Sequence, residues 1–230
     1  MQINILTSDN TPLSIELNNK AAAHFSAPAS HIDCILHQQI NTDRIYDFYF
    51  KNKQDLTIVD AGANVGIFSL YAHTKAKRIY SIEPTPDHFD ILKQLTQPFS
   101  NIIPINCALW SNDTELRFFV NPNNTTANTA MNSNGIPITV KARSLPSLIK
   151  EYNIDHIDLI KMDIEGAEFN VVSDEFIEYC YPIIDSWFLE VHTSALCHTF
   201  DLCKEKMSNM FKKHNYNVES KSSDGLFIYK

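Results

Sequence analysis

The sequence predicts an α/β fold in which helices cover both faces of a mostly parallel β-sheet. Short apolar strands alternate with helical segments from residue 56 onward, and this βαβ order is typical of parallel sheets. Hydrophobic residues make up 44% of the chain and charged residues 20%, as in a folded globular protein. The last two apolar segments flank a turn-rich link at 222–225, which predicts that they pair antiparallel.

The individual elements follow from the spacing of the apolar residues. Strands are predicted over 56–60, 79–83, 102–107, 157–163 and 187–191, with two more at 216–221 and 226–229. Helices are predicted over 65–74, 85–96, 144–152, 165–180 and 200–214. Together these segments indicate one domain over residues 51–230.

Two segments fall outside this pattern. Residues 1–50 are expected to form an appendage, because alternating apolar residues around Asp9-Asn10 predict a hairpin and helical spacing predicts a helix over 30–50. The asparagine-rich stretch 121–137 has no apolar period, so we expect a long mobile loop there. Such loops often serve as lids or binding loops.

The composition argues against several classes of partner. The chain has 19 Lys and Arg against 27 Asp and Glu, and this net charge of -8 disfavours nucleic acid and anionic membranes. No apolar run approaches the roughly 18 residues of a membrane-spanning helix, and the N-terminus lacks a signal-peptide pattern. Five scattered cysteines are more typical of reduced thiols than of a disulfide framework. These features predict a cytoplasmic location, while the oligomeric state stays open.

The sharpest local motif is VDAGANVG at 59–66, where a buried strand passes through small residues into a helix. Gly62 lets a ligand approach the backbone, and the N–H groups of the following helix would supply donors. Glu83 ends the next strand, where a carboxylate can accept both hydroxyls of a ribose. Asn64 stands where a dinucleotide motif has its second glycine, which weakens a nicotinamide interpretation. Alternatively, the glycines only make a tight turn and Glu83 caps a helix, but the combination favours a nucleoside pocket.

The segment DLIKMDIEGAE at 158–168 contains four acids and a lysine, which lie in and just after the strand predicted at 157–163. Asp163 lies at the carboxyl edge of the sheet, where open α/β sheets bind ligands, and shares a face with Lys161. A lysine inside an apolar strand needs a carboxylate partner, so we expect Lys161 to pair with an acid of this segment. Glu165 and Glu168 are explained by helix-dipole stabilisation, whereas Asp163 is expected to be functional.

Another polar pair ends the next strand, where Glu190 and His192 share a face. His192 could accept a hydroxyl proton, because imidazole titrates near neutral pH. The alternative is a structural histidine.

The motifs VDAGANVG, SIEP and LIKMDIEGAE together resemble the FkbM family of S-adenosylmethionine-dependent methyltransferases, over about residues 55–192. The resemblance implies a class I methyltransferase fold, a Rossmann-like seven-stranded sheet whose last strand is antiparallel. It also implies S-adenosyl-L-methionine as cofactor and O-methylation of a hydroxyl on a sugar, glycoconjugate or polyketide-type natural product. The expected partner is therefore a small-molecule or glycan acceptor.

The same resemblance implies roles for individual residues. The implied cofactor-binding residues are Asp60, Gly62, Ala63 and Asn64 near the methionine part, Glu83 at the ribose, and Cys107 and Ala108 near adenine. Asp163 would lie below the sulfonium. The candidate proton acceptors are Asp163, His192 and Glu165, with Glu190 orienting the histidine.

A divalent metal is not favoured. Asp163 and Glu190 end adjacent strands, and their oxygen atoms would suit Mg²⁺ or Ca²⁺. The residue beside Glu190 is Val191, which offers no second ligand. The metal ligands therefore stay unassigned.

Two other functions remain open from the sequence. An NAD-dependent oxidoreductase would use the same turn and ribose acid, but Asn64 argues against it. A noncatalytic nucleoside-binding module would keep the pocket without using the acids.

Overall fold

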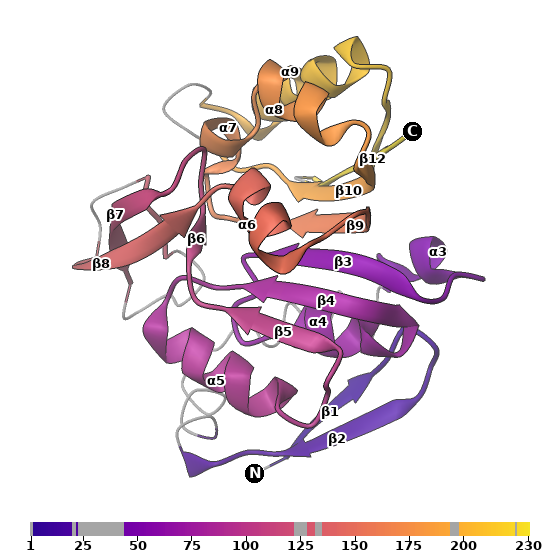
Figure 1. Ribbon diagram of the computed structural model, residues 1–230, viewed down its shortest axis with the longest axis vertical. Helices are drawn as coiled ribbons and strands as arrows, with labels where there is room; N and C mark the ends of the chain where they lie inside the picture. Colours follow the sequence, from indigo (N-terminus) through magenta and orange to yellow (C-terminus); the bar gives the residue numbers. More distant parts are fainter. Residues whose placement is uncertain are drawn as a thin grey trace.

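The computed structural model describes residues 2–19, 22, 44–121, 128–131, 135–193, 198–223 and 225–230. A seven-stranded sheet runs through the centre of the molecule in the order β11-β12-β10-β9-β3-β4-β5 (Figure 1). Its strands are β3 (Leu56–Ala61), β4 (Ala76–Ile82), β5 (Ile102–Ile105), β9 (Ile157–Met162), β10 (Ile184–Glu190), β11 (Asn217–Ser220) and β12 (Gly225–Tyr229). Only β12 runs against its neighbours, so the predicted fold class is confirmed.

Helices cover both faces of this sheet, and each face has its own apolar core. One core includes residues of α6 (Leu145–Tyr152), α8 (Asp174–Cys180) and α9 (Phe200–Lys213). The other includes residues of α3 (Asp47–Phe50), α4 (Ile67–Ala72) and α5 (Pro86–Thr96). The 3-10 helix η2 (His73–Lys75) follows α4. The central strands are therefore buried on both sides, which accounts for their continuous apolar runs.

The single helix predicted over 165–180 is wrong. Residues up to Ala167 form a turn, and two short helices follow, α7 (Glu168–Val171) and α8. Ser173 separates them, because its backbone is extended and its hydroxyl accepts a hydrogen bond from the N–H of Phe176. Such a serine starts a new helix rather than continuing the old one.

The N-terminal hairpin is confirmed as β1 (Gln2–Leu6) paired antiparallel with β2 (Pro12–Glu16). It packs on the α4 side of the sheet, where Ile5 is buried and Ser8 N–H donates to the carbonyl of Tyr71 at 2.9 Å. The helix predicted over 30–50 falls mostly on 23–43, outside the described residues, and α3 is the described part. A domain boundary at residue 50 stays a prediction.

A smaller three-stranded sheet, which the sequence pattern did not reveal, lies beyond the carboxyl ends of β4 and β5 (Figure 1). It consists of β6 (Ala108–Leu109), β7 (Thr114–Val120) and β8 (Ile136–Arg143), in the order β6-β8-β7. The predicted loop 121–137 is therefore wrong at its end, which belongs to β8. Within the predicted loop, Thr129 forms an isolated bridge to Phe119, and residues 122–127 and 132–134 lie outside the described residues.

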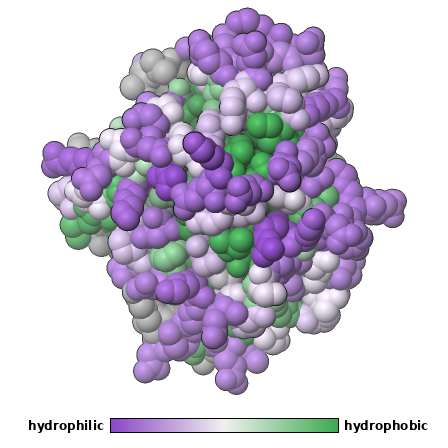
Figure 2. All heavy atoms as spheres, in the orientation of Figure 1, coloured by the Kyte–Doolittle hydropathy of each residue, from purple (hydrophilic) through white to green (hydrophobic). Residues whose placement is uncertain are grey.

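Polar residues cover most of the face shown in Figure 2, with separate hydrophobic patches between them. Among the described residues, no helix combines the length and apolar character needed to cross a membrane. Cys107 and Cys180 are free and buried, as expected. Cys203 is disulfide-bonded, so the expectation of reduced thiols is wrong for that residue.

Gly62 is needed where β3 passes the end of β9. A Cβ atom at this position would lie 1.7 Å from the carbonyl oxygen of Asp163, and its φ of +77° is one that side chains rarely adopt. We expect Gly62→Ala to lower the free energy of unfolding by about 2–4 kcal/mol, as strain adds to the clash. Urea denaturation measures this loss.

Gly225→Ala is the matched control, because its Cβ would clash only with the exposed Ser222 hydroxyl, whose rotation costs one exposed hydrogen bond. Equal losses in the two variants would contradict a specific requirement at Gly62.

Candidate functional site

A cavity of about 210 Å³ lies at the carboxyl edge of the large sheet. Its walls come from the turn after β3, the segment after β4, the loop after β9 and the small sheet. The residues predicted for the site that line it are Gly62, Ala63, Asn64, Glu83, Ala108, Asp163 and Glu165. Asp60 and Cys107 do not line it, since both are buried behind its wall. His192 reaches the cavity through its contacts with Asp163 and Glu165.

The turn after β3 shapes the cavity through small residues rather than through free N–H groups. Gly62 and Ala63 both donate their N–H groups to the carbonyl of Ile82, at 3.0 and 2.9 Å. Gly66 donates to the carbonyl of Ala63, and Asn64 donates to a carboxylate. These four N–H groups are therefore already engaged within the protein.

Glu83 is held rigidly in the cavity wall. One carboxylate oxygen accepts the N–H of Asn64 at 3.0 Å, and the other accepts the N–H of Thr85 at 2.8 Å. Nδ1 of His88 lies 3.9 Å from the second oxygen. Burial raises the pKa of Glu83, although the two N–H donors oppose that shift. The remaining lone pairs of this fixed carboxylate can accept hydroxyl groups of a ligand.

Lys161 lies beneath the cavity and is almost completely buried. Its Nζ lies 3.2 Å from Oδ2 of Asp163, 3.2 Å from the carbonyl oxygen of Gly62 and 3.8 Å from Oδ1 of Asp60. The predicted pairing of Lys161 with an acid is thus confirmed. Burial lowers the pKa of Lys161, but Asp163 and Asp60 together raise it above its ordinary value. Lys161 therefore stays charged and balances two acids at once.

Four acids surround the imidazole of His192 at the end of β9 and β10. Nδ1 of His192 lies 3.0 Å from Oε1 of Glu168, at hydrogen-bond distance. Its Nε2 lies 3.6 Å from Glu165, 3.9 Å from Asp163 and 4.0 Å from Glu190. The expected orienting residue, Glu190, is therefore replaced in that role by Glu168.

Glu168 is the functional residue that sequence reasoning missed. Its side chain is fully buried and accepts N–H groups from Ile164 at 3.3 Å and Gly166 at 3.2 Å, besides contacting His192. Glu168 lies in the first turn of α7, as the helix-dipole interpretation expects, but that interpretation does not account for its complete burial. Nothing in the spacing of the sequence distinguishes this buried acid from an exposed one.

A tight turn directs Glu165 toward the histidine. Glu165 has φ 55° and Gly166 has φ 95°, so two successive residues are left-handed. Thr129 of the segment between β7 and β8 fixes this turn, because its hydroxyl donates to the carbonyl of Glu165 at 2.7 Å. Burial and the charge of Asp163 raise the pKa of Glu165 to about 8. Burial lowers the pKa of His192, but the surrounding carboxylates, Glu168 above all, outweigh burial and raise it to about 10.

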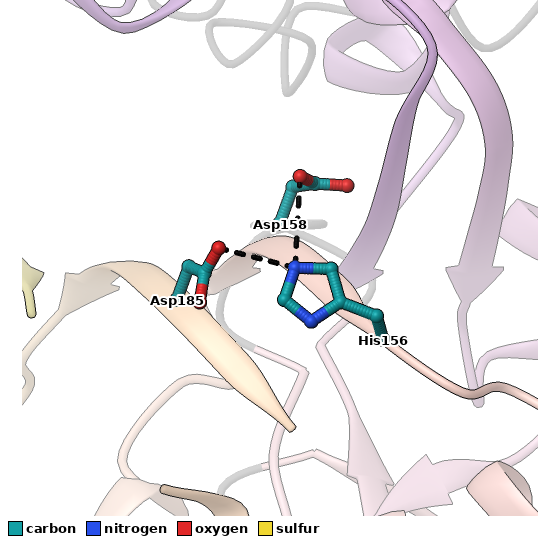
Figure 3. Close-up of side chains that lie close together, drawn as sticks. All are labelled: His156, Asp158 and Asp185. Atoms are coloured by element: carbon teal, nitrogen blue, oxygen red, sulfur yellow. Dashed lines mark hydrogen bonds and ion pairs between the residues drawn. The ribbon is translucent and has the colours of Figure 1, made fainter. Parts of the chain in front are cut away.

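A second histidine and acid cluster lies at the opposite, amino-terminal end of β9 and β10 (Figure 3). Nε2 of His156 lies 3.1 Å from Asp185 and 3.7 Å from Asp158. Both acids have other partners, since Asp185 pairs with Lys230 at 3.0 Å and Asp158 accepts the N–H of Thr57 at 2.8 Å. This cluster is more exposed and stabilises the sheet edge away from the cavity.

Comparison with known proteins gives consistent results. The pattern of the methyltransferase FkbM domain matches residues 60–218. Methyltransferase sdnD of Sordaria araneosa is 29% identical over 199 residues, covering 71% of this chain and 75% of that protein. Hexuronic acid methyltransferase AglP of Haloferax volcanii is 26% identical over 121 residues, covering 52% of this chain and 50% of that protein.

Among solved structures, the fibrillarin pre-rRNA processing protein of Methanococcus jannaschii aligns with a TM-score of 0.48 and 13% identity. The alignment covers 76% of this chain and 66% of that chain. The domain match and the strand order, rather than this likeness, carry the fold assignment.

The buried ion network around Lys161 makes a stability prediction. Lys161→Met leaves the fully buried Asp60 without its cation, so we expect the free energy of unfolding to fall by about 3–5 kcal/mol. Adding Asp60→Asn should recover part of that loss, because the double variant no longer buries the Asp60 charge and only Asp163 is left without its cation. Urea denaturation of both variants measures the difference.

Lys213→Met serves as the control, since it breaks an exposed ion pair with Asp174 and should change stability little. Additive losses from Lys161→Met and Asp60→Asn would show that the two residues do not interact.

Proposed function

Because this chain belongs to the FkbM methyltransferase family, we propose that it transfers a methyl group to a hydroxyl of a sugar, glycoconjugate or polyketide-type natural product. Family membership makes it an S-adenosylmethionine-dependent methyltransferase. The observation that supports a hydroxyl acceptor is the cluster of Asp163, Glu165 and His192 beside the cavity. A hydroxyl must lose its proton during the transfer, and this cluster offers groups that can take it.

The cavity suits the donor S-adenosylmethionine in three respects. The fixed carboxylate of Glu83 can accept the ribose hydroxyls, since both its oxygens are already oriented by N–H groups. Ala108, Leu109 and Phe118 give an apolar wall for a base. Oδ1 of Asp163 is buried without a hydrogen-bond partner among the described residues, and can face a positively charged group. The donor supplies an activated methyl group on a sulfonium.

The side chains then need to position and deprotonate the acceptor. As the acceptor oxygen forms its bond to the methyl carbon, the carbon–sulfur bond breaks and the sulfonium becomes a thioether. The hydroxyl proton passes to a side chain of the cluster. Glu165 and His192, whose pKa values are raised, can take it only after losing their own proton, which leaves Asp163 as the acceptor near neutral pH. Alignment of oxygen, carbon and sulfur in an enclosed cavity supplies much of the acceleration.

We assign the choice of acceptor to the segments outside the large sheet that line the cavity. Leu116 and Phe118 of the small sheet line the cavity, together with Asn128 and Ala130 of the segment between β7 and β8. The name of AglP specifies a hexuronic acid, which supports a sugar as one acceptor class. The net charge of -8 argues against nucleic acid. Neither the oxidoreductase nor the noncatalytic alternative is supported by the family match.

Glu83→Ala should weaken binding of S-adenosylhomocysteine by about 1–3 kcal/mol, because a charged acceptor for the ribose is lost. Isothermal titration calorimetry measures the affinity. Glu115→Ala, which removes an exposed acid of β7, should bind like the wild type. Unchanged affinity in the Glu83 variant would remove this residue from the cofactor site.

The function itself is tested by methyl transfer. The protein is incubated with S-adenosylmethionine carrying a labelled methyl group and with pooled sugars and polyols, and mass spectrometry identifies the methylated product. We expect an O-methyl product, and His192→Ala should lower turnover by about 10²-fold or more while S-adenosylhomocysteine still binds.

His156→Ala is the matched control, because it removes a histidine at the far edge of the sheet. Methylation only of nitrogen or carbon atoms would refute the hydroxyl acceptor, and wild-type turnover of His192→Ala would exclude that residue from catalysis.

A further inference from the structure

We propose that Asp163, Glu165 and His192 bind one divalent cation at the acceptor side of the cavity. Each residue offers one ligand atom, and these atoms all lie within 4.8 Å of one another. Asp163 and Glu165 lie in the loop after β9, and His192 follows β10, so two segments far apart in the chain converge. The set differs from the sequence-based pair of Asp163 and Glu190, because the left-handed turn brings Glu165 inward.

The spacing of these atoms suits a shared ion better than direct hydrogen bonds. Nε2 of His192 lies 3.6 Å from Oε2 of Glu165 and 3.9 Å from Oδ1 of Asp163. Hydrogen bonds would draw these atoms to about 3 Å. Two ligands that each lie about 2.0–2.2 Å from one ion are separated by about 3–4 Å, and both distances from the histidine fall in this range.

The histidine is oriented as a metal ligand. Its Nδ1 lies 3.0 Å from Oε1 of the fully buried Glu168, which leaves Nε2 directed toward Asp163 and Glu165. A carboxylate on the second nitrogen of the imidazole is the usual support of a metal-binding histidine. The arrangement fixes the ring before any ion arrives.

Two buried carboxylate oxygens, one in the proposed ligand set and one beside it, lack a compensating group. Oδ1 of Asp163 and Oε2 of Glu168 are both buried and have no hydrogen-bond partner among the described residues. Buried carboxylate oxygens without partners are costly. Oδ1 of Asp163 is also the atom that faces Nε2 of His192, so an ion between them would satisfy it.

The cluster of His156, Asp158 and Asp185 lacks these features, although its ligand atoms are as close together (Figure 3). Lys230 and the N–H of Thr57 already satisfy its acids. No unpartnered buried oxygen belongs to it. It therefore serves as an internal control for the specificity of metal binding.

Two carboxylate oxygens and one imidazole nitrogen form a mixed set that suits Mn²⁺ and similar divalent ions. What the ion contributes rests on the proposed function: its positive charge beside the acceptor hydroxyl would ease removal of the proton. Binding of the ion does not depend on that function.

Titration of the chelator-treated full chain with Mn²⁺, followed by electron paramagnetic resonance, tests the site. We expect one bound Mn²⁺ per chain. Glu165→Gln and His192→Ala should each weaken binding at least about 10-fold, and Glu168→Gln by about 10–100-fold. His156→Ala should bind Mn²⁺ like the wild type.

Retained S-adenosylhomocysteine binding in each variant shows that the fold is intact. Absence of Mn²⁺ binding, equal affinity in all variants, or loss of binding in His156→Ala would overturn the proposal. Mn²⁺ binding with no methyl transfer to any hydroxyl would leave the metal site standing and remove the proposed acceptor class, so the two failures are distinct.

Discussion

The buried charge of Lys161 is the constraint on which the site depends. A single ammonium group lies between Asp60 at the end of β3 and Asp163 beyond the end of β9, and it also contacts the carbonyl of Gly62. Buried carboxylates are tolerated only when a cation or several donors compensate them. Lys161 thereby joins the two central strands where they open into the cavity and sets the position of Asp163.

The small sheet is a structural part of the site as well as its wall. It has its own apolar core, which includes Phe118, Val140 and Ala142, so it does not depend on the ligand for packing. Thr129, in the segment that connects β7 and β8, holds the turn that carries Glu165 through a hydrogen bond to its carbonyl. One segment therefore determines both the shape of the cavity and the direction of an acid in the cluster.

The large sheet was predictable from the sequence because its signals are local. Buried parallel strands read as apolar runs, and the glycine turn and Glu83 sit at fixed places on them. The pairing of Lys161 was predictable because a lysine in an apolar strand has few alternatives. The small sheet was not predicted, because the asparagine-rich stretch separates β7 from β8 and no tight turn marks their antiparallel pairing. The buried position of Glu168 and the inward turn of Glu165 depend on φ angles and tertiary contacts that spacing does not encode.

The hydrogen bond between Thr129 and the carbonyl of Glu165 limits how new acceptor preferences can be engineered. Grafting the β7–β8 region of another enzyme onto this chain would change the cavity wall, but it would also release the turn after β9 unless the incoming loop carries an equivalent donor. A chimera that preserves this donor together with residues 163–168 keeps the acids in place. Recombination boundaries are therefore best drawn to transfer the loop and the turn as a unit.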